Sequence, residues 1–158
     1  MTRIKLCLLS LSMVFFILQS CTKDKMDETG TVYNGSPLIE FAHLTGTMNR
    51  TVAYTTASPA EMKDSVKIQL IGPQRSTPTT ITFEVDAAGT TGTAGVDYVN
   101  LTTTGNTAVI PANQSLVWLV FNFIRPAAGT KTLKLNLVSG DNVGLSANYK
   151  SMVFTWKK

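Results

Sequence analysis

The chain has 158 residues, a formal net charge of +4, one histidine and two cysteines. That length is typical of a single domain. From residue 21 onward the chain carries 12 basic and 10 acidic residues, because Arg3 and Lys5 precede that point. The lysines are scattered and no nucleic-acid-binding motif occurs, so we expect no nucleic acid partner.

Residues 1–20 are predicted to form a signal peptide. Arg3 and Lys5 precede an apolar run of 13 residues, 6–18. A membrane-spanning helix needs about 20 residues, whereas the apolar core of a signal peptide needs only about 7–15. The run ends in Leu18-Gln19-Ser20-Cys21, which resembles the lipobox of bacterial lipoproteins. The resemblance implies that Cys21 is lipidated and becomes the first mature residue. The alternative is a plain secreted protein.

The cysteines agree with this interpretation. Cys7 would leave with the signal peptide and Cys21 would carry lipid, so the mature domain would hold neither a disulfide nor a cysteine-ligated metal. Two or more lipid chains hold a protein firmly on a membrane. We therefore expect the protein to be lipid-anchored to a bacterial outer membrane.

Residues 21–37 are predicted to be the lipidated cysteine and a flexible tether, because they show no apolar periodicity and contain several helix and strand breakers. The charged stretch 23–28 resembles the export signal of surface-exposed Bacteroidetes lipoproteins. That resemblance implies exposure on the cell surface. The alternative is an ordinary solvated tether.

Residues 38–158 are predicted to form the folded domain. Apolar residues recur at every second position in segments 65–70, 80–85, 131–137 and 152–156, a spacing that predicts strands. Segments 38–44 and 50–55 show a weaker strand pattern, and 117–124 is a seventh predicted strand. Segment 117–124 is apolar almost throughout, which favours a strand covered on both faces. No long amphipathic helix is evident. The pattern predicts an all-β, antiparallel, immunoglobulin-like sandwich of about seven strands.

The middle of the domain carries a recognisable pattern. Phe83–Asp86, the loop residues Gly92–Tyr98, and Val109–Gln114 before an apolar strand resemble the Calx-β repeat. Uncharacterised domains of Bacteroidetes surface lipoproteins are similar. The resemblance covers about residues 60–140 and implies a Calx-β-like sandwich, with little indication of activity.

Calcium is the cofactor that this resemblance raises. Calx-β domains that bind calcium place acidic residues between the long strand and the next, where this chain has Ile124–Gly129 without a carboxylate. Ca²⁺ takes six to eight oxygen ligands. Glu84, Asp86 and Asp97 are the remaining metal candidates. We expect no cofactor, with calcium at these three residues as the alternative.

Catalytic residues are not evident. His43 is the only histidine, so a Ser-His-Asp triad or a histidine metal site is hard to assemble. Glu84 and Asp86 share the strand face opposite Phe83 and Val85, which predicts solvated side chains. We therefore expect a protein that is not an enzyme.

Aromatic residues offer the better binding candidates, because sugar rings stack on aromatic faces. Trp118 lies on an almost wholly apolar strand and Trp156 alternates with Phe154, and both patterns favour the core. Tyr98 is expected to pack near the loop. Tyr54 and Tyr149 are less constrained and are candidates for exposure. The candidate ligand contacts are Tyr54, Tyr98, Trp118 and Tyr149.

Two functions remain open. The first is a glycan-binding accessory protein of a polysaccharide uptake system, which predicts exposed aromatic residues on one sheet or in the end loops. The second is a protein–protein adhesion or assembly module at the cell surface, which predicts a long uncovered strand edge or an apolar patch and no aromatic platform.

Overall fold

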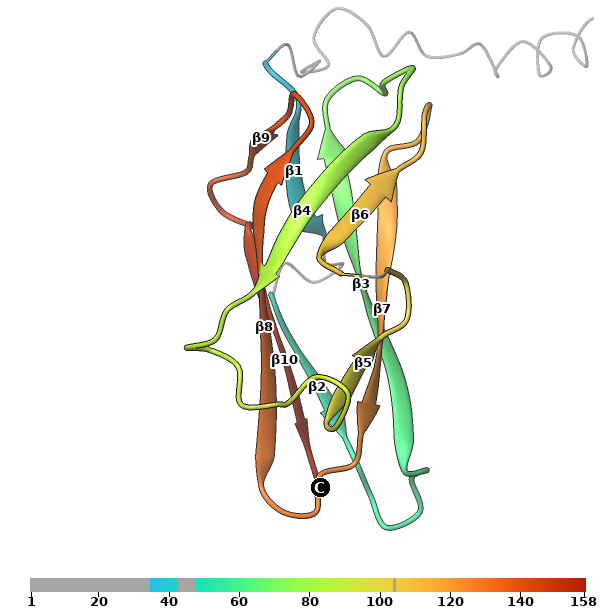
Figure 1. Ribbon diagram of the computed structural model, residues 1–158, viewed down its shortest axis with the longest axis vertical. Helices are drawn as coiled ribbons and strands as arrows, with labels where there is room; N and C mark the ends of the chain where they lie inside the picture. Colours follow the sequence, from blue (N-terminus) through green and yellow to red (C-terminus); the bar gives the residue numbers. More distant parts are fainter. Residues whose placement is uncertain (1–34, 43–47, 104) are drawn as a thin grey trace, which may run out of the picture. The chain divides into compact units, whose positions relative to one another are not determined.

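The computed structural model describes residues 35–42, 48–103 and 105–158. The predicted signal peptide, Cys21, His43 and most of the predicted tether lie outside the described residues. The described part folds into two five-stranded sheets (Figure 1). Its strands are β1 (Leu38–Ala42), β2 (Asn49–Ala53), β3 (Glu61–Ile71), β4 (Thr79–Val85), β5 (Tyr98–Asn100), β6 (Thr107–Ile110), β7 (Leu116–Ile124), β8 (Thr130–Gly140), β9 (Gly144–Leu145) and β10 (Ser151–Lys157).

The first sheet has the strand order β5-β7-β3-β1-β9, and the second has the order β2-β10-β8-β4-β6. Most neighbours are antiparallel, as predicted. Two pairs are parallel, β1 with β9 and β2 with β10, and this corrects the expectation of a purely antiparallel sandwich. Both parallel pairs join strands that are distant in the sequence, so a local sequence pattern cannot predict them.

All seven predicted strands are present, so the all-β sandwich is confirmed. The described residues contain three further strands, β5, β6 and β9, each of two to four residues. Strands this short contain too few alternations to stand out from a loop. No helix long and apolar enough to cross a membrane occurs in the described part of the chain.

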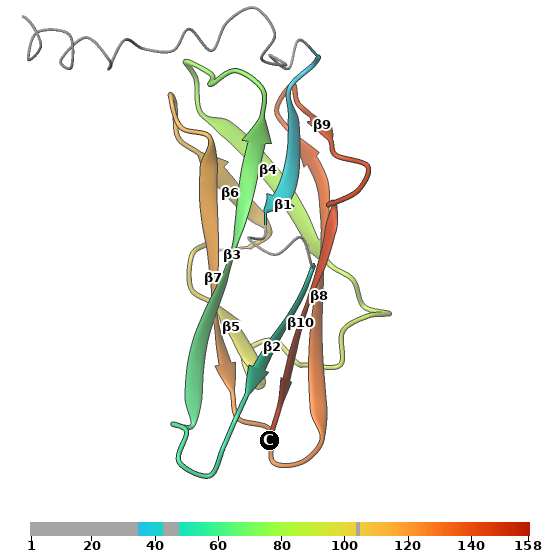
Figure 2. The ribbon, with the colours of Figure 1, turned by 180° about the vertical axis from the view of Figure 1, so that it is seen from behind.

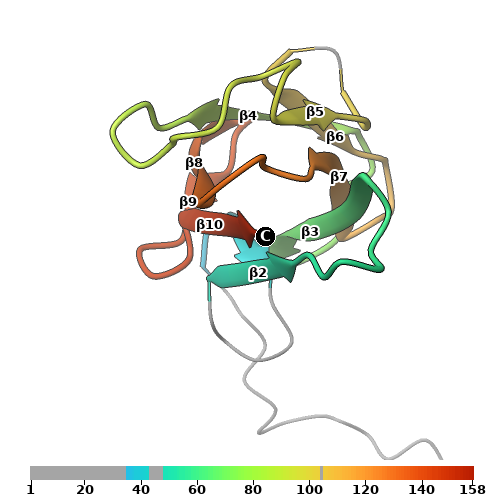
Figure 3. The same cartoon turned by 90° about the horizontal axis from the view of Figure 1, so that it is seen from below.

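The core fills the space between the two sheets, which enclose it on both sides when viewed along the strands (Figure 3). Alternate residues of each long strand point inward, as the period of two requires. Aromatic rings form the centre: the centroids of Phe123 and Phe154 lie 5.1 Å apart, and those of Phe123 and Trp156 lie 4.8 Å apart. Trp156 has no exposed surface, which confirms its predicted core position.

Strand β7 differs from its prediction. Leu119, Phe121 and Phe123 are buried, but Leu116 and Trp118 are 41% and 47% exposed. Only one face of this strand is covered, so the prediction that both faces are buried was wrong. Within the described residues nothing packs on the outer face of the sheet at this end of β7, so the side chains of Leu116 and Trp118 are exposed to solvent.

The loop between β4 and β5 packs on the core. The Gly92 backbone approaches the Trp156 ring so closely that an added Cβ would lie 2.6 Å from a ring carbon. Gly95 adopts a φ of 77°, which glycine tolerates without strain. Asp97 then accepts a hydrogen bond from the main-chain N–H of Thr93 at 2.8 Å. The segment that resembles the Calx-β motif is therefore a closed structural turn.

Candidate functional site

Trp118 is the large aromatic side chain that the described surface offers to a ligand. It stands on the outer face of the sheet β5-β7-β3-β1-β9, opposite Lys67 of β3. Figure 2 shows β3 and β7 side by side in this sheet. The Lys67 ammonium lies 5.6 Å from the Trp118 ring centroid. Such a cation over a ring face is electrostatically attracted to it. The expectation that Trp118 lies in the core was therefore wrong.

Polar groups lie beside Trp118 on the same face. Gln69 of β3 pairs with Leu116 on one side and Glu40 of β1 on the other. The Gln69 amide donates to the Glu40 carboxylate at 2.7 Å. Farther along β7, the Asn122 amide donates to Glu61 at 2.6 Å. The face thus presents the Trp118 ring near a cation, two amides and the exposed Glu61 carboxylate, whereas Glu40 is buried beneath its bond to Gln69.

Apolar side chains also share this region. The most exposed are Leu116, Leu101 and Val99, at 41%, 48% and 39%. Leu101 follows β5 and bonds through its N–H to Val120 of β7 at 2.8 Å. We call the set Val99, Leu101, Leu116, Trp118 and Lys67 the Trp118 face.

The three tyrosines that the sequence offered as ligand contacts occupy other environments. Tyr54 is buried, contrary to the expectation of exposure, because its hydroxyl donates to the main-chain oxygen of Phe123 at 2.5 Å and Arg125 covers its ring. Tyr98 is buried edge-on against Phe121 and Trp156, as expected of a packing residue. Tyr149 is half-buried.

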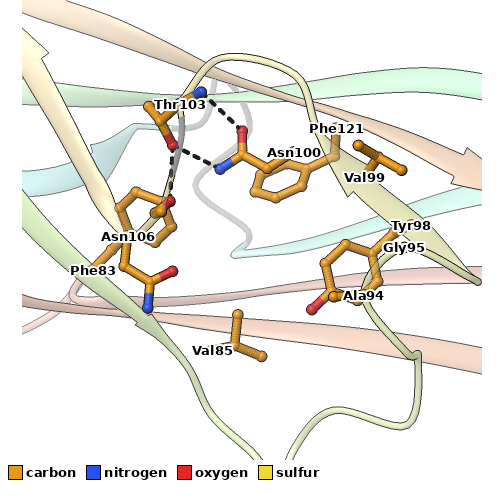
Figure 4. A pocket seen from close by; sticks show the side chains of 11 residues that line it. Phe83, Val85, Ala94, Gly95, Tyr98, Val99, Asn100, Thr103, Asn106 and Phe121 are labelled. Carbon is orange, nitrogen blue, oxygen red and sulfur yellow. Dashed lines mark hydrogen bonds between the residues drawn. The ribbon is translucent and has the colours of Figure 1, made fainter.

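Tyr98 also forms part of a pocket of about 260 Å³ (Figure 4). Its apolar walls include Phe83, Val85 and Phe121, and its polar residues include Asn100 and Asn106. The Asn100 side chain is engaged within its own turn, because its amide donates to the Thr103 hydroxyl at 2.8 Å. Burial raises the pKa of Tyr98 above its ordinary value of 10. This lining suits packing and hydrogen bonding.

The three candidate metal ligands do not converge. Asp86 pairs with Lys134 at 2.7 Å, and Asp97 pairs with Lys131 at 3.3 Å. Glu84 is exposed and, like Asp86, accepts from the Asn136 amide at 3.3 Å, so these two share a face as predicted. No group of three or more potential metal ligands forms among the described residues.

The Asp86 carboxylate is held ionised by its neighbours. The Lys134 side chain, the Gly89 N–H and the Asn136 amide lower the pKa of Asp86 from 3.8 to about 2. Each of these groups stabilises the charged form. The arrangement ties the β4–β5 loop to β8.

The fold resembles several solved structures. The apo-form Calx CBD1 domain matches with a TM-score of 0.54 and 15% identity, over 78% of this chain and 99% of that domain. A Bacteroides ovatus protein of unknown function matches with a TM-score of 0.54 and 16% identity, over 77% of this chain and 47% of that chain. CBD12 from CALX1.2 matches with a TM-score of 0.52 and 16% identity, over 75% of this chain and 42% of that chain.

No family model matches the chain, and no curated protein matches it. The chain spans less than half of the Bacteroides ovatus protein and of CBD12. At these identities the likeness concerns the fold. The domain therefore has a Calx-β-like, immunoglobulin-like sandwich fold, and the function must be argued from its surface.

Proposed function

We propose that this protein is a non-catalytic glycan-binding module and that Trp118 is its stacking platform. The observation that carries the proposal is a half-exposed tryptophan ring on an outer sheet face, flanked by Lys67 and Gln69. An indole ring joins a large apolar surface to a polar edge, which matches the alternation of C–H faces and hydroxyls on a sugar. Lys67 and Gln69 supply hydrogen-bond donors beside the ring.

The strand register supports this arrangement. Trp118 lies opposite Lys67, and Leu116 lies opposite Gln69, so the side chains stand in two adjacent rows on one face. Residues directly opposite one another in antiparallel strands have Cβ atoms about 4.5–5.5 Å apart. A sugar ring on Trp118 would therefore lie within reach of both polar side chains.

Cell-surface placement belongs to the same proposal. Lipidation at Cys21 would anchor the domain to the bacterial outer membrane, and the predicted tether would separate it from the bilayer, as an accessory protein of polysaccharide uptake requires. In Cys21→Ser we expect the protein to move from the membrane fraction to the soluble fraction. Unchanged fractionation of Cys21→Ser would contradict the anchor and leave the glycan proposal standing.

Binding tests the glycan proposal directly. The full chain would be screened on a polysaccharide array, and hits would be measured by titration calorimetry with Trp118→Ala. We expect affinity to fall at least about tenfold, equivalent to about 1.4 kcal/mol. Leu116→Ala is the matched control, because it removes an exposed apolar side chain of the same face without an aromatic ring. Equal binding by wild type and Trp118→Ala, or an array without hits, would refute the proposal.

Protein binding at the cell surface is the second candidate function. The observation that favours it is the exposure of Leu101, Leu116 and Val99 around Trp118. Protein interfaces are enriched in aromatic anchors surrounded by apolar contacts. This candidate predicts that Leu116→Ala weakens binding of a protein partner about as much as Trp118→Ala does, whereas the glycan proposal predicts a large difference between the two variants.

A further inference from the structure

The N-terminal half of β7 has an open edge. Val120 is the last residue bonded on that side: its oxygen accepts from the Leu101 N–H at 2.8 Å, and its N–H donates to the Thr102 hydroxyl at 2.7 Å. Main-chain groups alternate in direction along a strand, so Trp118 and Leu116 direct theirs to the same edge. Among the described residues, no main-chain group bonds to these two across it.

A second strand edge faces the first. Figures 1 and 2 both show β6 beside the N-terminal half of β7 and β5 beside its C-terminal half. The oxygen of Asn106 accepts from the N–H of Phe83 on β4 at 2.9 Å, so by alternation Thr107 and Val109 turn their main-chain groups away from β4. No strand of the described chain pairs with β6 on that side. The two sheets therefore leave a seam between β6 and β7.

The seam contains a groove of about 370 Å³. Its lining mixes small apolar side chains with hydroxyls: Thr102, Thr103, Thr107, Ala108, Val109 and Val117. A groove between two strand edges offers both main-chain partners and a place for a side chain. Binding by strand addition uses these two features together.

We propose that the β6–β7 seam binds a short extended peptide of another protein, which adds to β7 as a strand in line with β5. Leu116 and Trp118 each offer one N–H and one C=O to the peptide main chain. The peptide residue opposite Val117 would share its face of the sheet and direct its side chain into the groove. The groove's size and lining favour a small or branched residue there, such as threonine or valine.

The length of the open edge argues for a short peptide as the occupant. Four residues, Leu116–Leu119, lie free of β5, which corresponds to about 13 Å of strand. Leu101 and Thr102 close one end of this stretch through their bonds to Val120. A second copy would bring its own β7 of nine residues, longer than the open stretch.

The test begins with random ten-residue peptides displayed on phage and selected on the full chain. An enriched peptide would be synthesised with single N-methyl groups along its main chain, and its affinity measured by titration calorimetry. We expect methylation at alternate residues to reduce affinity at least about tenfold, since only those N–H groups face β7. Amide exchange should slow at Leu116 and Trp118 when the peptide binds.

Two valines supply a matched control. Val109 lines the groove and Val138 lies on β8, and they are 47% and 46% exposed. Val109→Arg should reduce peptide affinity at least about tenfold, whereas Val138→Arg should leave it unchanged. The absence of an enriched peptide, equal tolerance of N-methylation at all positions, or self-association of the chain that Val109→Arg abolishes would overturn the proposal. Glycan binding by Trp118 is measured separately and does not depend on this result.

Discussion

The two halves of β7 are both mainly apolar and both direct alternate residues into the core, but they differ in how the outer face and one strand edge are covered. In the C-terminal half, Phe121 and Phe123 point into the core, and β5 and β3 pair on both sides. In the N-terminal half, Trp118 lies on the outer face beside an edge that β5 does not reach. Leu119 in the N-terminal half is buried like Phe121 and Phe123, so the difference between the halves lies in the exposed outer face and the uncovered edge of the N-terminal half.

The two halves of β7 also differ in the side-chain hydrogen bonds that they receive from the opposite side of the sandwich. Tyr54 donates to the oxygen of Phe123 at 2.5 Å, and the Trp156 indole donates to the oxygen of Ile124 at 3.2 Å. Both donors come from chain segments at or next to the opposite sheet, so the C-terminal end of β7 is fixed across the sandwich. The N-terminal half has neighbours on its surface but no such buried ties among the described residues. The proposed binding sites therefore lie at the end of β7 that no such side-chain hydrogen bond joins to the opposite sheet among the described residues.

Phe123→Ala should give the largest effect, because it removes a fully buried ring that packs on Phe154 and Trp156. We expect the free energy of unfolding to fall by about 3–5 kcal/mol, the usual cost of such a truncation. Urea unfolding followed by circular dichroism measures it. A loss no larger than that of Trp118→Ala would contradict the contrast between the two halves.

Tyr54→Phe should give an intermediate effect. It keeps the ring beneath Arg125 and removes the hydrogen bond to Phe123. A buried hydrogen bond contributes about 1 kcal/mol, and we expect a loss of that size in urea unfolding. Tyr149→Phe is the control, because that side chain is half-buried and belongs to neither half of β7. An equal loss in both variants would show that Tyr54 has no special role.

Trp118→Ala should change stability by less than about 1 kcal/mol, because the side chain is half-exposed and leaves no cavity in the core. The chain has two tryptophans, so fluorescence separates them. Iodide should quench Trp118 and leave Trp156 largely unaffected. Quenching of the fluorescence that persists in Trp118→Ala would place Trp156 in solvent and contradict its burial in the core.

Lowering the pH should leave unchanged the difference in unfolding free energy between Phe123→Ala and Trp118→Ala, although it weakens the ion pair of Asp86. The pKa of Asp86 is lowered from 3.8 to about 2, chiefly by Lys134, so its stabilising contribution is complete above pH about 4 and is lost as the pH falls through about 2. We expect wild-type stability to decline over this window and Asp86→Asn to decline less. The difference in unfolding free energy between Phe123→Ala and Trp118→Ala should be equal at neutral pH and at pH about 3, since neither removes a charge.

Much of the fold followed from local patterns. Alternation predicted the long strands, and the burial of Ile81 and Phe83 in β4 agrees with it. Trp118 could not be placed in this way, because in an uninterrupted apolar segment alternation of polarity gives no phase. The polar partners of Trp118 did carry a signal: Lys67 and Gln69 occupy the polar positions of an alternating strand, which directs them outward.

By itself the sequence determined the all-β class, the places of seven strands and the inward residues of strands that alternate, because the strand period acts on residues two apart. The tertiary structure alone decided that Tyr54 is buried, that Trp118 is exposed and that β6 and β7 face one another across a seam. These properties depend on which strands become neighbours and where the short strand β5 ends. Such long-range pairings leave no trace in the local order of residues.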